Sequence, residues 1–391
     1  MVDFWNEEKV KSINKKKLVI AIILGILAIA ISTLIVIYNV SPDFQKWTDK
    51  NILGKEIFQD MVATIDLENE NSKVFAFNKN IGVLNKNKFD IYNNYGTKEK
   101  SFEVEITNPL FCAKNRFVAI AEKNGKKIYL IEDKKIAWEN DIEGEIIEIS
   151  VNKNGYVAVV ITGTSYKTVV DVFDNNGNEL FKKYLSNTRL ADVSISNDNK
   201  FLAMAEVDTS GTIIQSNIKI ISIEKVLVNP EESMVKVYNG AANDLIINIE
   251  YQNNNKLACM YDNSIHLIDD EKDEVLIDFK DKKSIASSIE LTNNVVNVSE
   301  QSSGLFTADS IINIISTDSK TSKTYTTDEV TKEIATFENI IALNLGTEIE
   351  FINTDAWLVK RYISKQEITN LVLSNSIAGV VYRDKIEIIN L

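Results

Sequence analysis

Cysteine, histidine and proline are scarce in this 391-residue chain, which contains two, one and three of them. Two cysteines cannot build a disulfide framework, and with one histidine they cannot build a Cys/His zinc site. Three prolines exclude a Pro-rich linker. Basic residues are also outnumbered, 43 against 56 acidic ones, so the formal net charge is −13. This balance argues against a nucleic-acid partner, because a phosphate backbone requires a basic surface.

Charge is absent from one long segment, residues 18–38. Five lysines and three acids precede it, net +2, and 38 basic and 53 acidic residues follow it, net −15. A helix of 21 residues spans about 31 Å, the thickness of a bilayer core. Ala28-Ile29-Ala30 resembles a signal-peptide cleavage site, but the apolar run exceeds the roughly 7–15 residues of a signal-peptide core. We therefore predict an uncleaved transmembrane helix over residues 18–38.

The orientation of this helix follows from the lysines at residues 15–17, since little basic excess follows the span directly. By the positive-inside rule, residues 1–17 form a cytoplasmic tail, and the rest of the chain lies outside the cell membrane. We expect residues 39–56 to form a juxtamembrane helix or linker. Ser41-Pro42-Asp43 has the order of an N-cap, a proline in the first turn and a first-turn acid.

From about residue 57 the chain shows short apolar runs separated by Asn, Asp, Gly and Lys, without a helical period. A strand with an aliphatic residue followed by a small one recurs about every 42 residues, and a second apolar strand follows it each time. The pairs are Ile81-Gly82, Val118-Ala119, Val157-Ala158, Leu202-Ala203, Leu257-Ala258, Val295-Val296, Ile341-Ala342 and Ile377-Ala378. This period is typical of a propeller blade. We predict an all-β fold, an eight-bladed β-propeller of four-stranded antiparallel blades, preceded by the transmembrane helix.

The sequence also predicts how the ring closes. The third strand of the last repeat ends at Leu391, and residues 57–67 form an unassigned strand before the first repeat. If these two strands pair, residues 57–391 form a closed propeller without a free sheet edge. Asparagine precedes each small residue by two to four positions, and Asn154-Gly155 and Asn176-Gly177 predict type I′ hairpin turns.

Three segments resemble known propeller repeats. Ser196-Asn-Asp-Asn-Lys-Phe-Leu-Ala203 resembles the turn and strand of WD40-like and YVTN-type bacterial propellers. Asp133-Lys-Lys-Ile-Ala-Trp138 and Asp174-Asn-Asn-Gly-Asn-Glu-Leu-Phe181 resemble the blade ends of quinoprotein-like propellers, in which an Asp-Gly turn leads to an aromatic residue. The whole layout is similar to single-pass membrane propellers of unknown function from low-GC Gram-positive bacteria. Such a resemblance implies the fold and leaves the function open.

Signatures of propeller enzymes are not visible in the sequence. Ser316-Thr-Asp318 lacks the glycine and tryptophan of a sialidase-type turn. The adjacent-cysteine disulfide and the calcium site that quinone-dependent propeller dehydrogenases share are missing as well. Cys112 and Cys259 fall in the second and fifth repeats, too far apart for a disulfide, and we interpret them as buried small hydrophobic residues. We expect no catalytic residue and no cofactor.

Two further patterns have competing explanations. His266 is the one imidazole available for acid–base chemistry. Its position in the third strand is polar in every repeat, which favours a general hydrogen-bonding role over catalysis. Asp174, Asn176 and Asn178 alternate like calcium ligands, but a hairpin turn explains the same residues and no bidentate glutamate follows at a suitable distance. We therefore predict no metal site.

Loop length varies where the second strand of a repeat leads to the third. The loops are long in repeats three, four and six, over residues 162–167, 208–217 and 299–309, and all emerge on one face of the disc. Their Ser, Thr and Gly content with single aromatics resembles an adaptable recognition surface, although disordered loop tips have a similar composition. The candidate binding residues are Thr164, Tyr166, Asp208, Ser210, Ser303 and Phe306. Residues 225–233 form an insertion on the opposite face.

These observations favour a membrane-anchored extracytoplasmic propeller that acts as a non-enzymatic binding or scaffold module for an envelope protein, peptide or other ligand. The alternative is an extracytoplasmic propeller enzyme, a hydrolase or cofactor-dependent oxidoreductase, that uses acidic residues near the central channel. A third hypothesis is an envelope sensor, although the cytoplasmic tail contains no recognisable domain. A net charge of −15 outside the membrane argues against tight adhesion to anionic lipid or wall polymer unless cations bridge the two.

Overall fold

The computed structural model describes residues 15–40 and most of residues 63–391. It leaves out residues 70, 241–243, 253–255, 270–271, 281–282 and 303–307, and between 41 and 62 it describes residues 44, 47, 48, 52 and 61. Most of the predicted juxtamembrane segment and the predicted site residues Ser303 and Phe306 therefore lie outside the described residues. The chain divides into two compact units, residues 1–56 and 57–391.

The first unit contains the helix α1 (Lys15–Val40). Its segment Leu18–Tyr38 has a mean hydropathy of 3.1, and none of it is buried inside the protein. A helix that is apolar on every side and uncovered by other parts of the chain requires a nonpolar environment. α1 is therefore long and apolar enough to cross a membrane once, as a single-pass anchor or a signal sequence does.

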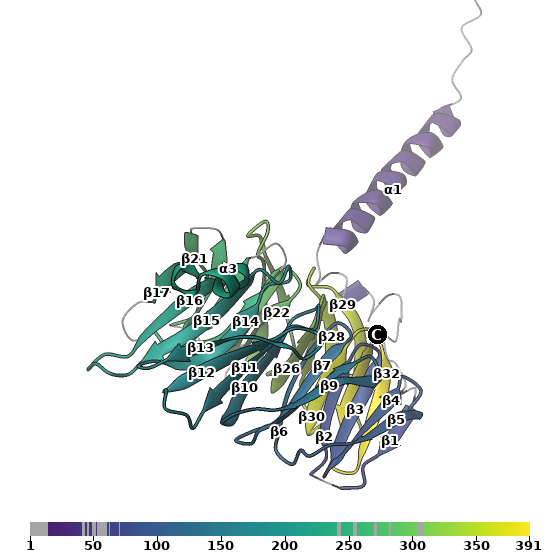
Figure 1. The fold of residues 1–391 in the computed structure, drawn as a ribbon. Helices are drawn as coiled ribbons and strands as arrows, with labels where there is room; N and C mark the ends of the chain where they lie inside the picture. The colour runs from purple at the N-terminus through teal and green to yellow at the C-terminus, as the bar shows by residue number, and fades with distance from the viewer. Residues whose placement is uncertain are drawn as a thin grey trace, which may run out of the picture. The chain divides into compact units, whose positions relative to one another are not determined.

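The second unit consists of eight four-stranded antiparallel sheets, the blades (Figure 1). Blade 1 contains β2 (Lys73–Phe77), β3 (Asn80–Asn85), β4 (Lys88–Asn93) and β5 (Lys98–Glu103). Blade 2 contains β6 (Pro109–Lys114), β7 (Phe117–Glu122), β8 (Lys127–Glu132) and β9 (Lys135–Asp141). Blade 3 contains β10 (Glu145–Val151), β11 (Val157–Thr162), β12 (Thr168–Phe173) and β13 (Glu179–Leu185). Blade 4 contains β14 (Arg189–Ile195), β15 (Phe201–Asp208), β16 (Gln215–Ser222) and β17 (Met234–Asn239), with the helices α3 (Ile223–Val228) and η1 (Pro230–Glu232) between the last two strands.

The other four blades repeat this order. Blade 5 contains β18 (Ile246–Tyr251), β19 (Leu257–Tyr261), β20 (Ser264–Asp269) and β21 (Lys272–Asp278). Blade 6 contains β22 (Ser284–Leu291), β23 (Asn294–Ser302), β24 (Ala308–Ser316) and β25 (Ser322–Thr326). Blade 7 contains β26 (Glu333–Phe337), β27 (Ile340–Asn344), β28 (Glu348–Asn353) and β29 (Leu358–Ile363). Blade 8 contains β30 (Asn370–Ser374), β31 (Ile377–Val381), β32 (Lys385–Asn390) and, as its fourth strand, β1 (Ala63–Asp66).

The blades form a closed ring. The first strand of each blade contacts the first strand of the next, and β30 of blade 8 contacts β2 of blade 1, so these strands surround the central channel. β1 pairs antiparallel with β32, from Ala63 opposite Ile388 to Asp66 opposite Lys385, and thereby joins the two ends of the repeat array in one sheet. The predicted eight-bladed propeller of four-stranded antiparallel blades is thus confirmed.

The ring has two faces, which we name by their connections. The turn face carries the turns between the first and second strands and between the third and fourth strands of each blade. The loop face carries the connections between second and third strands and those between blades. The chain enters the ring at the turn face, because Ala63 lies at the end of β32 next to the β30–β31 turn and packs against Gly96 in the β4–β5 turn.

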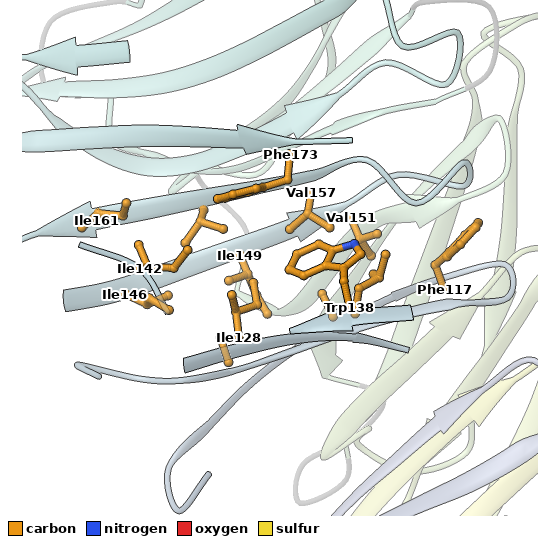
Figure 2. Packing of buried hydrophobic residues seen from close by; sticks show 14 of the residues in the cluster. Phe117, Ile128, Trp138, Ile142, Ile146, Ile149, Val151, Val157, Ile161 and Phe173 are labelled. Carbon is orange, nitrogen blue, oxygen red and sulfur yellow. The ribbon is translucent and has the colours of Figure 1, made fainter. Parts of the chain in front are cut away.

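The core lies between neighbouring blades. Figure 2 shows the cluster between blades 2 and 3, in which the rings of Trp138 and Phe173 lie 5.7 Å apart. The repeated position lies in the second strand of every blade and holds Gly or Ala in all but blade 6, which has Val296. It is fully buried in seven blades, for example at Ala119 and Ala158. At Gly82, a Cβ would come within 2.6 Å of the Phe89 ring. Phe89 belongs to the neighbouring strand β4 of the same blade and packs against blade 2, so the small residue makes room for a large side chain between the two sheets.

The prediction of type I′ turns at Asn154-Gly155 and Asn176-Gly177 is wrong. Only the two glycines have positive φ, +82° each, whereas a type I′ turn needs positive φ at both central residues. The Gly177 N–H donates to the Asp174 carbonyl (3.1 Å), and the Asp174 side chain accepts from the N–H groups two and four residues further on. This side-chain turn holds Asn176 at negative φ and lengthens the loop.

Candidate functional site

Four of the six predicted binding residues lie on the loop face of blades 3 and 4. Thr164 and Tyr166 belong to the β11–β12 loop, and Tyr166 is 42% exposed with its ring 4.7 Å from that of Tyr184 on β13. Asp208 ends β15 and accepts hydrogen bonds from the Ser210 hydroxyl (2.6 Å) and backbone N–H (2.9 Å). The hydrogen bonds from Ser210, and the nearby positive charges, lower the pKa of the Asp208 carboxyl. The two loops thus form ordered turns on neighbouring blades.

A buried acid lies beneath these loops. Glu206 of β15 is fully buried and accepts hydrogen bonds from the Thr188 hydroxyl and the Lys219 ammonium, each at 2.7 Å. Removing either partner would leave part of a buried charge uncompensated, so the network fixes the base of the β15–β16 hairpin. Nothing in the sequence distinguishes Glu206 from a solvated acid near the end of a strand.

Exposed hydrophobic residues are concentrated on the outer wall of blade 4. Seven of the sixteen strongly exposed large hydrophobic residues in the described part of the ring belong to this one blade. We name these seven residues the blade 4 wall. They are Ile213, Ile214, Leu227, Val228, Met234, Val235 and Val237. Single exposed hydrophobic residues are common on protein surfaces, but a concentration of them on one element marks an interaction surface.

Helix α3 contributes two of these residues for a local reason. The Ser222 hydroxyl caps it by accepting the Lys225 N–H at 3.3 Å. The helix buries Ile223 and Val226 against blades 3 and 4. With six residues it cannot turn every apolar side chain inward, so Leu227 and Val228 face outward, and Val228 is 82% exposed.

Strand β17 contributes three more residues of the blade 4 wall. It pairs with β16 on one side, from Asn217 opposite Asn239 to Ile221 opposite Met234, with a bulge at Val235. Its other side is the outer edge of blade 4, since the order of strands in this sheet ends at β17. Met234, Val235 and Val237 are 42%, 44% and 45% exposed. Because β17 ends beside the start of β16, the apolar surface continues to Ile213 and Ile214 in the preceding loop.

The central channel is a second candidate site. The Lys114 ammonium from blade 2 and a Glu250 carboxylate oxygen from blade 5 lie 2.9 Å apart, three blades away from each other around the ring. Cavities of about 320 Å³ and 230 Å³ share these two residues and Glu290 in their linings, and the larger one is also lined by turn-face residues such as Asn115 and Lys153. The ion pair therefore bridges the channel between the two cavities.

Burial shifts several pKa values in the channel. Burial raises the pKa of Asp192 to about 8, against the hydrogen bonds that its carboxylate accepts from the N–H groups of Ile249 (2.8 Å) and Val193 (2.7 Å). Burial also raises the pKa of Glu250, although Lys114 opposes the shift. For Lys114 itself, burial favours the neutral amine, but the nearby carboxylates outweigh it and raise the pKa. Among the described residues, no group of three or more His, Cys, Asp or Glu side chains is placed to hold a metal ion.

The remaining sequence candidates lie elsewhere. Within blade 5, His266 contacts Asp273 through Nδ1 (2.9 Å) and Ser264 through Nε2 (3.0 Å), and it is absent from the lining of both channel cavities. The same position of other blades also holds cross-strand pairs, such as Asp90 with Lys98 at 2.7 Å. Asp174 uses both carboxylate oxygens within its own turn.

Both cysteines are free thiols. Cys259 is buried in blade 5, in agreement with the interpretation as a buried small residue. Cys112 is only partly buried, so the same interpretation is wrong for it; it lies on β6 in the wall of the smaller channel cavity. Burial raises the pKa of its thiol to about 12, so it stays protonated at neutral pH.

The fold and its surfaces define a β-propeller that follows an N-terminal apolar helix. Residues 56–391 match a family described as "Family of unknown function (DUF5711)", and the chain belongs to this family. No curated protein matches the chain in sequence.

Solved structures resemble the chain at the level of the fold. The match to BamB from Moraxella catarrhalis covers 85% of this chain and 99% of BamB, with 10% identity and a TM-score of 0.52. The match to the C-terminal WD40 domain of Sif2 covers 86% and 98%, with 11% identity and a TM-score of 0.51. The match to Raptor from Chaetomium thermophilum covers 85% of this chain but only 28% of Raptor, with 12% identity and a TM-score of 0.50. Identities this low show the fold alone, and they confirm the resemblance to WD40-like propellers at that level.

Proposed function

We propose that the protein is a membrane-anchored, extracytoplasmic binding or scaffold module without enzymatic activity. Its blade 4 wall holds an extended segment of an envelope protein, which adds a strand to the free edge of β17. In this proposal α1 is an uncleaved single-pass anchor, residues 1–17 are cytoplasmic, and the propeller lies outside the plasma membrane. The lysines at residues 15–17 support this orientation.

The observation that carries the proposal is the unprotected edge of β17. An edge strand exposes unpaired backbone N–H and C=O groups, and soluble proteins usually protect such edges with charged side chains. β17 has the sequence MVKVYN and contains one charged residue, Lys236. The outer strands β5 and β21 contain four each. An apolar edge strand is suited to strand addition by a partner segment.

The charges around β17 indicate the chemistry of the partner. The insertion before the strand carries Glu224, Glu231 and Glu232, and none of the three forms an ion pair with another described residue. We therefore propose a segment with alternating aliphatic side chains and a lysine or arginine at the end that meets these acids. A second copy of this chain is a poorer match, because two rings of net charge −15 would repel each other.

The predicted loop residues extend this surface in the same proposal. Thr164, Tyr166, Asp208 and Ser210 lie on the loop face of blades 3 and 4, beside the Ile213 end of the blade 4 wall. Aromatic and hydroxyl side chains on ordered turns provide contact area and adaptable hydrogen bonds. We propose that these residues, with Ser303 and Phe306, contact the flanks of the bound segment.

Site-specific crosslinking in intact cells tests the proposal. A photoreactive amino acid replaces Met234 in β17, and a control replaces Val275, which is also exposed but lies on the charged outer strand β21. We expect one dominant adduct at Met234, whose linked peptide is extended, aliphatic and basic. Equal adducts at both positions, or a linked segment that is acidic or helical, would contradict the proposal. Digestion of the propeller by external protease in spheroplasts tests the orientation.

A second candidate function is catalysis in the channel, which the raised pKa of Asp192 favours. A carboxyl with a pKa of about 8 is protonated at neutral pH and can act as a general acid, and the neighbouring Glu148 and Glu250 supply further carboxyl groups. Screening the full-length protein against chromogenic esters, phosphates and glycosides tests this function. Turnover that Asp192→Asn abolishes supports it, and turnover that Asp192→Asn leaves unchanged excludes Asp192 as the general acid.

A further inference from the structure

A lysine-lined groove lies on the turn face between blades 1 and 2. Its volume is about 680 Å³, large enough for a lipid headgroup or several units of a polymer. It is lined by Asn78, Lys79, Asn80, Lys100, Glu132, Asp133, Lys134, Lys135, Ile136 and Ala137. The groove is separate from both the blade 4 wall and the channel. Its positive charge could not be inferred from the negative net charge of the ring.

Two facing turns bring the lysines together. Asn78, between β2 and β3, and Asp133, between β8 and β9, both adopt a left-handed backbone with φ of +51°. These short turns place Lys79 and Lys134 directly after them at the rims of the groove. A hydrogen bond from the Ser374 hydroxyl to the Asn78 carbonyl anchors the first turn to blade 8. The groove is therefore part of the rigid ring.

The acids of the groove are already partnered, whereas three of its lysines are not. Arg116 pairs with Glu132 at 2.7 Å, and the Asn78 amide donates to Asp133 at 3.5 Å. Lys134 pairs with Glu99, and its hydrogen bond lowers the pKa of that carboxyl. Lys79, Lys100 and Lys135 are exposed, and none forms an ion pair with another described residue. The groove thus offers uncompensated positive charge in a ring whose net charge is negative.

The groove lies on the face at which the chain enters the ring. Ala63 begins the closing strand at the turn face of blade 8, and it packs against Gly96 in the β4–β5 turn of blade 1. The closing strand of the ring therefore begins, at Ala63, next to blade 1, one of the two blades that form the groove.

We propose that this groove binds a phosphate-bearing anion, either the headgroup of an anionic lipid or the phosphate of a soluble wall-type polymer. Lysine ammonium groups are compact point charges that bind phosphate without a fixed geometry. They are therefore suited to an open groove that holds phosphate groups in several positions. Each lysine adds to the attraction toward an anionic surface, and the effect weakens as salt screens it. The net charge of −15 disfavours such binding for the ring as a whole, but the three lysines provide it locally.

Lysine footprinting on the full-length protein tests the proposal. The protein is placed in phosphatidylcholine nanodiscs, in nanodiscs with about one third phosphatidylglycerol, or in phosphatidylcholine nanodiscs with soluble poly(glycerol phosphate). Acetylation rates of individual lysines are read by mass spectrometry. We expect the acetylation of Lys79, Lys100 and Lys135 to slow at least threefold with one of the two phosphate sources, and to recover at high salt.

Two triple variants make the comparison specific. Lys79→Gln/Lys100→Gln/Lys135→Gln removes the groove charges, and Lys86→Gln/Lys123→Gln/Lys126→Gln removes three exposed charges from the loop face of the same two blades. The affinity for the effective phosphate source, measured by titration in the same nanodiscs, should fall about tenfold or more in the first variant and stay within twofold in the second.

Each outcome has a defined meaning. Protection by phosphatidylglycerol alone identifies a lipid headgroup, protection by the polymer alone identifies a polymer phosphate, and protection by both supports the shared chemistry. No protection by either source overturns the proposal, as does an equal loss of affinity in both variants. The footprint of the wild-type protein decides the question even if a variant fails to fold.

Discussion

Blades 1 and 4 share one architecture but differ at their outer edges. β5 and β17 are both six-residue fourth strands, each paired on one side with the third strand of its blade. Four of the six residues of β5 are charged, against one in β17. Three hydrophobic residues of β17 are strongly exposed, whereas β5 has none.

This difference indicates where the repeat constrains the sequence and where it does not. The second strands pack between neighbouring sheets, so their small residues recur in nearly every blade. The fourth strands face outward, where packing imposes little, and each edge is free to acquire its own chemistry. We infer that blade 1 keeps a protected edge beside a cationic groove, whereas blade 4 leaves its edge open for a partner.

Giving β17 the charge pattern of β5 should have the largest effect. Val235→Glu together with Val237→Lys protects the edge, so the adduct at Met234 should fall at least tenfold. Both side chains are nearly half exposed, so the free energy of unfolding should change by less than about 0.5 kcal/mol. Quantitative mass spectrometry of the adduct and urea denaturation measure the two effects.

The control for this variant is Val359→Lys on β29, the outer strand of blade 7. It adds a charge to a different edge and should leave the adduct unchanged. If the β17 variant retains its adduct while the protein stays folded, blade 4 does not bind through its edge, and its difference from blade 1 has no role in binding.

Removing charge from β5 should have a smaller effect, on stability. Lys98 pairs with Asp90 of β4 at 2.7 Å, and Asp90 is 6% exposed. Lys98→Met leaves this carboxylate with only the more distant Lys88, at 3.8 Å, and should cost about 1–2 kcal/mol. Lys100→Met, two residues further along the same strand, removes an exposed charge and should cost less than about 0.5 kcal/mol. Equal losses of unfolding free energy in the two variants would mean that the Lys98–Asp90 pair adds no stability. The charges of β5 would then serve only to protect the edge.

The architecture could be predicted from the sequence because the same three physical constraints act in each blade. A small residue is required between sheets, two apolar strands follow each other in phase, and asparagine is tolerated in tight turns. The turn types could not be predicted as well. Asn152 and Asp174 accept hydrogen bonds from backbone N–H groups of their own loops, and this changes the turn that Asn-Gly alone would form.

The candidate surfaces were predicted less completely for a different reason. Loop length indicated Tyr166 and Asp208, because extra residues between two predicted strands can be recognised in the sequence alone. The Lys114–Glu250 pair joins residues 136 positions apart. The lysine groove combines turns of two blades, and Val237 is notable only because its side chain faces outward. Such features form only when the ring closes, so no short sequence pattern predicts them.

The pH dependence of stability concerns the ring interior, which both edges share. Burial raises the folded-state pKa of Asp192 to about 8, above the unfolded value near 4. Between these two pH values the folded state binds more protons than the unfolded state. The contribution of Asp192 to the free energy of unfolding is therefore fully present below about pH 4 and is lost as the pH rises through about 8. We expect the Tm of the wild-type protein to fall by about 5 °C between pH 5 and pH 9.

The variant Asp192→Asn tests whether the pH dependence of the Tm arises in the channel and not at the edges of blades 1 and 4. The amide resembles the protonated carboxyl, so the variant should match the wild-type protein at pH 5 and exceed its Tm at pH 9. Asp171, whose pKa burial raises to about 7, shifts stability in the same direction, so the pH dependence should shrink without disappearing. The β17 variant should keep the full wild-type slope, because its substitutions are exposed. A slope that changes with the β17 variant would show that edge and interior are coupled, and blades 1 and 4 could then no longer be treated as one scaffold with two independent edges.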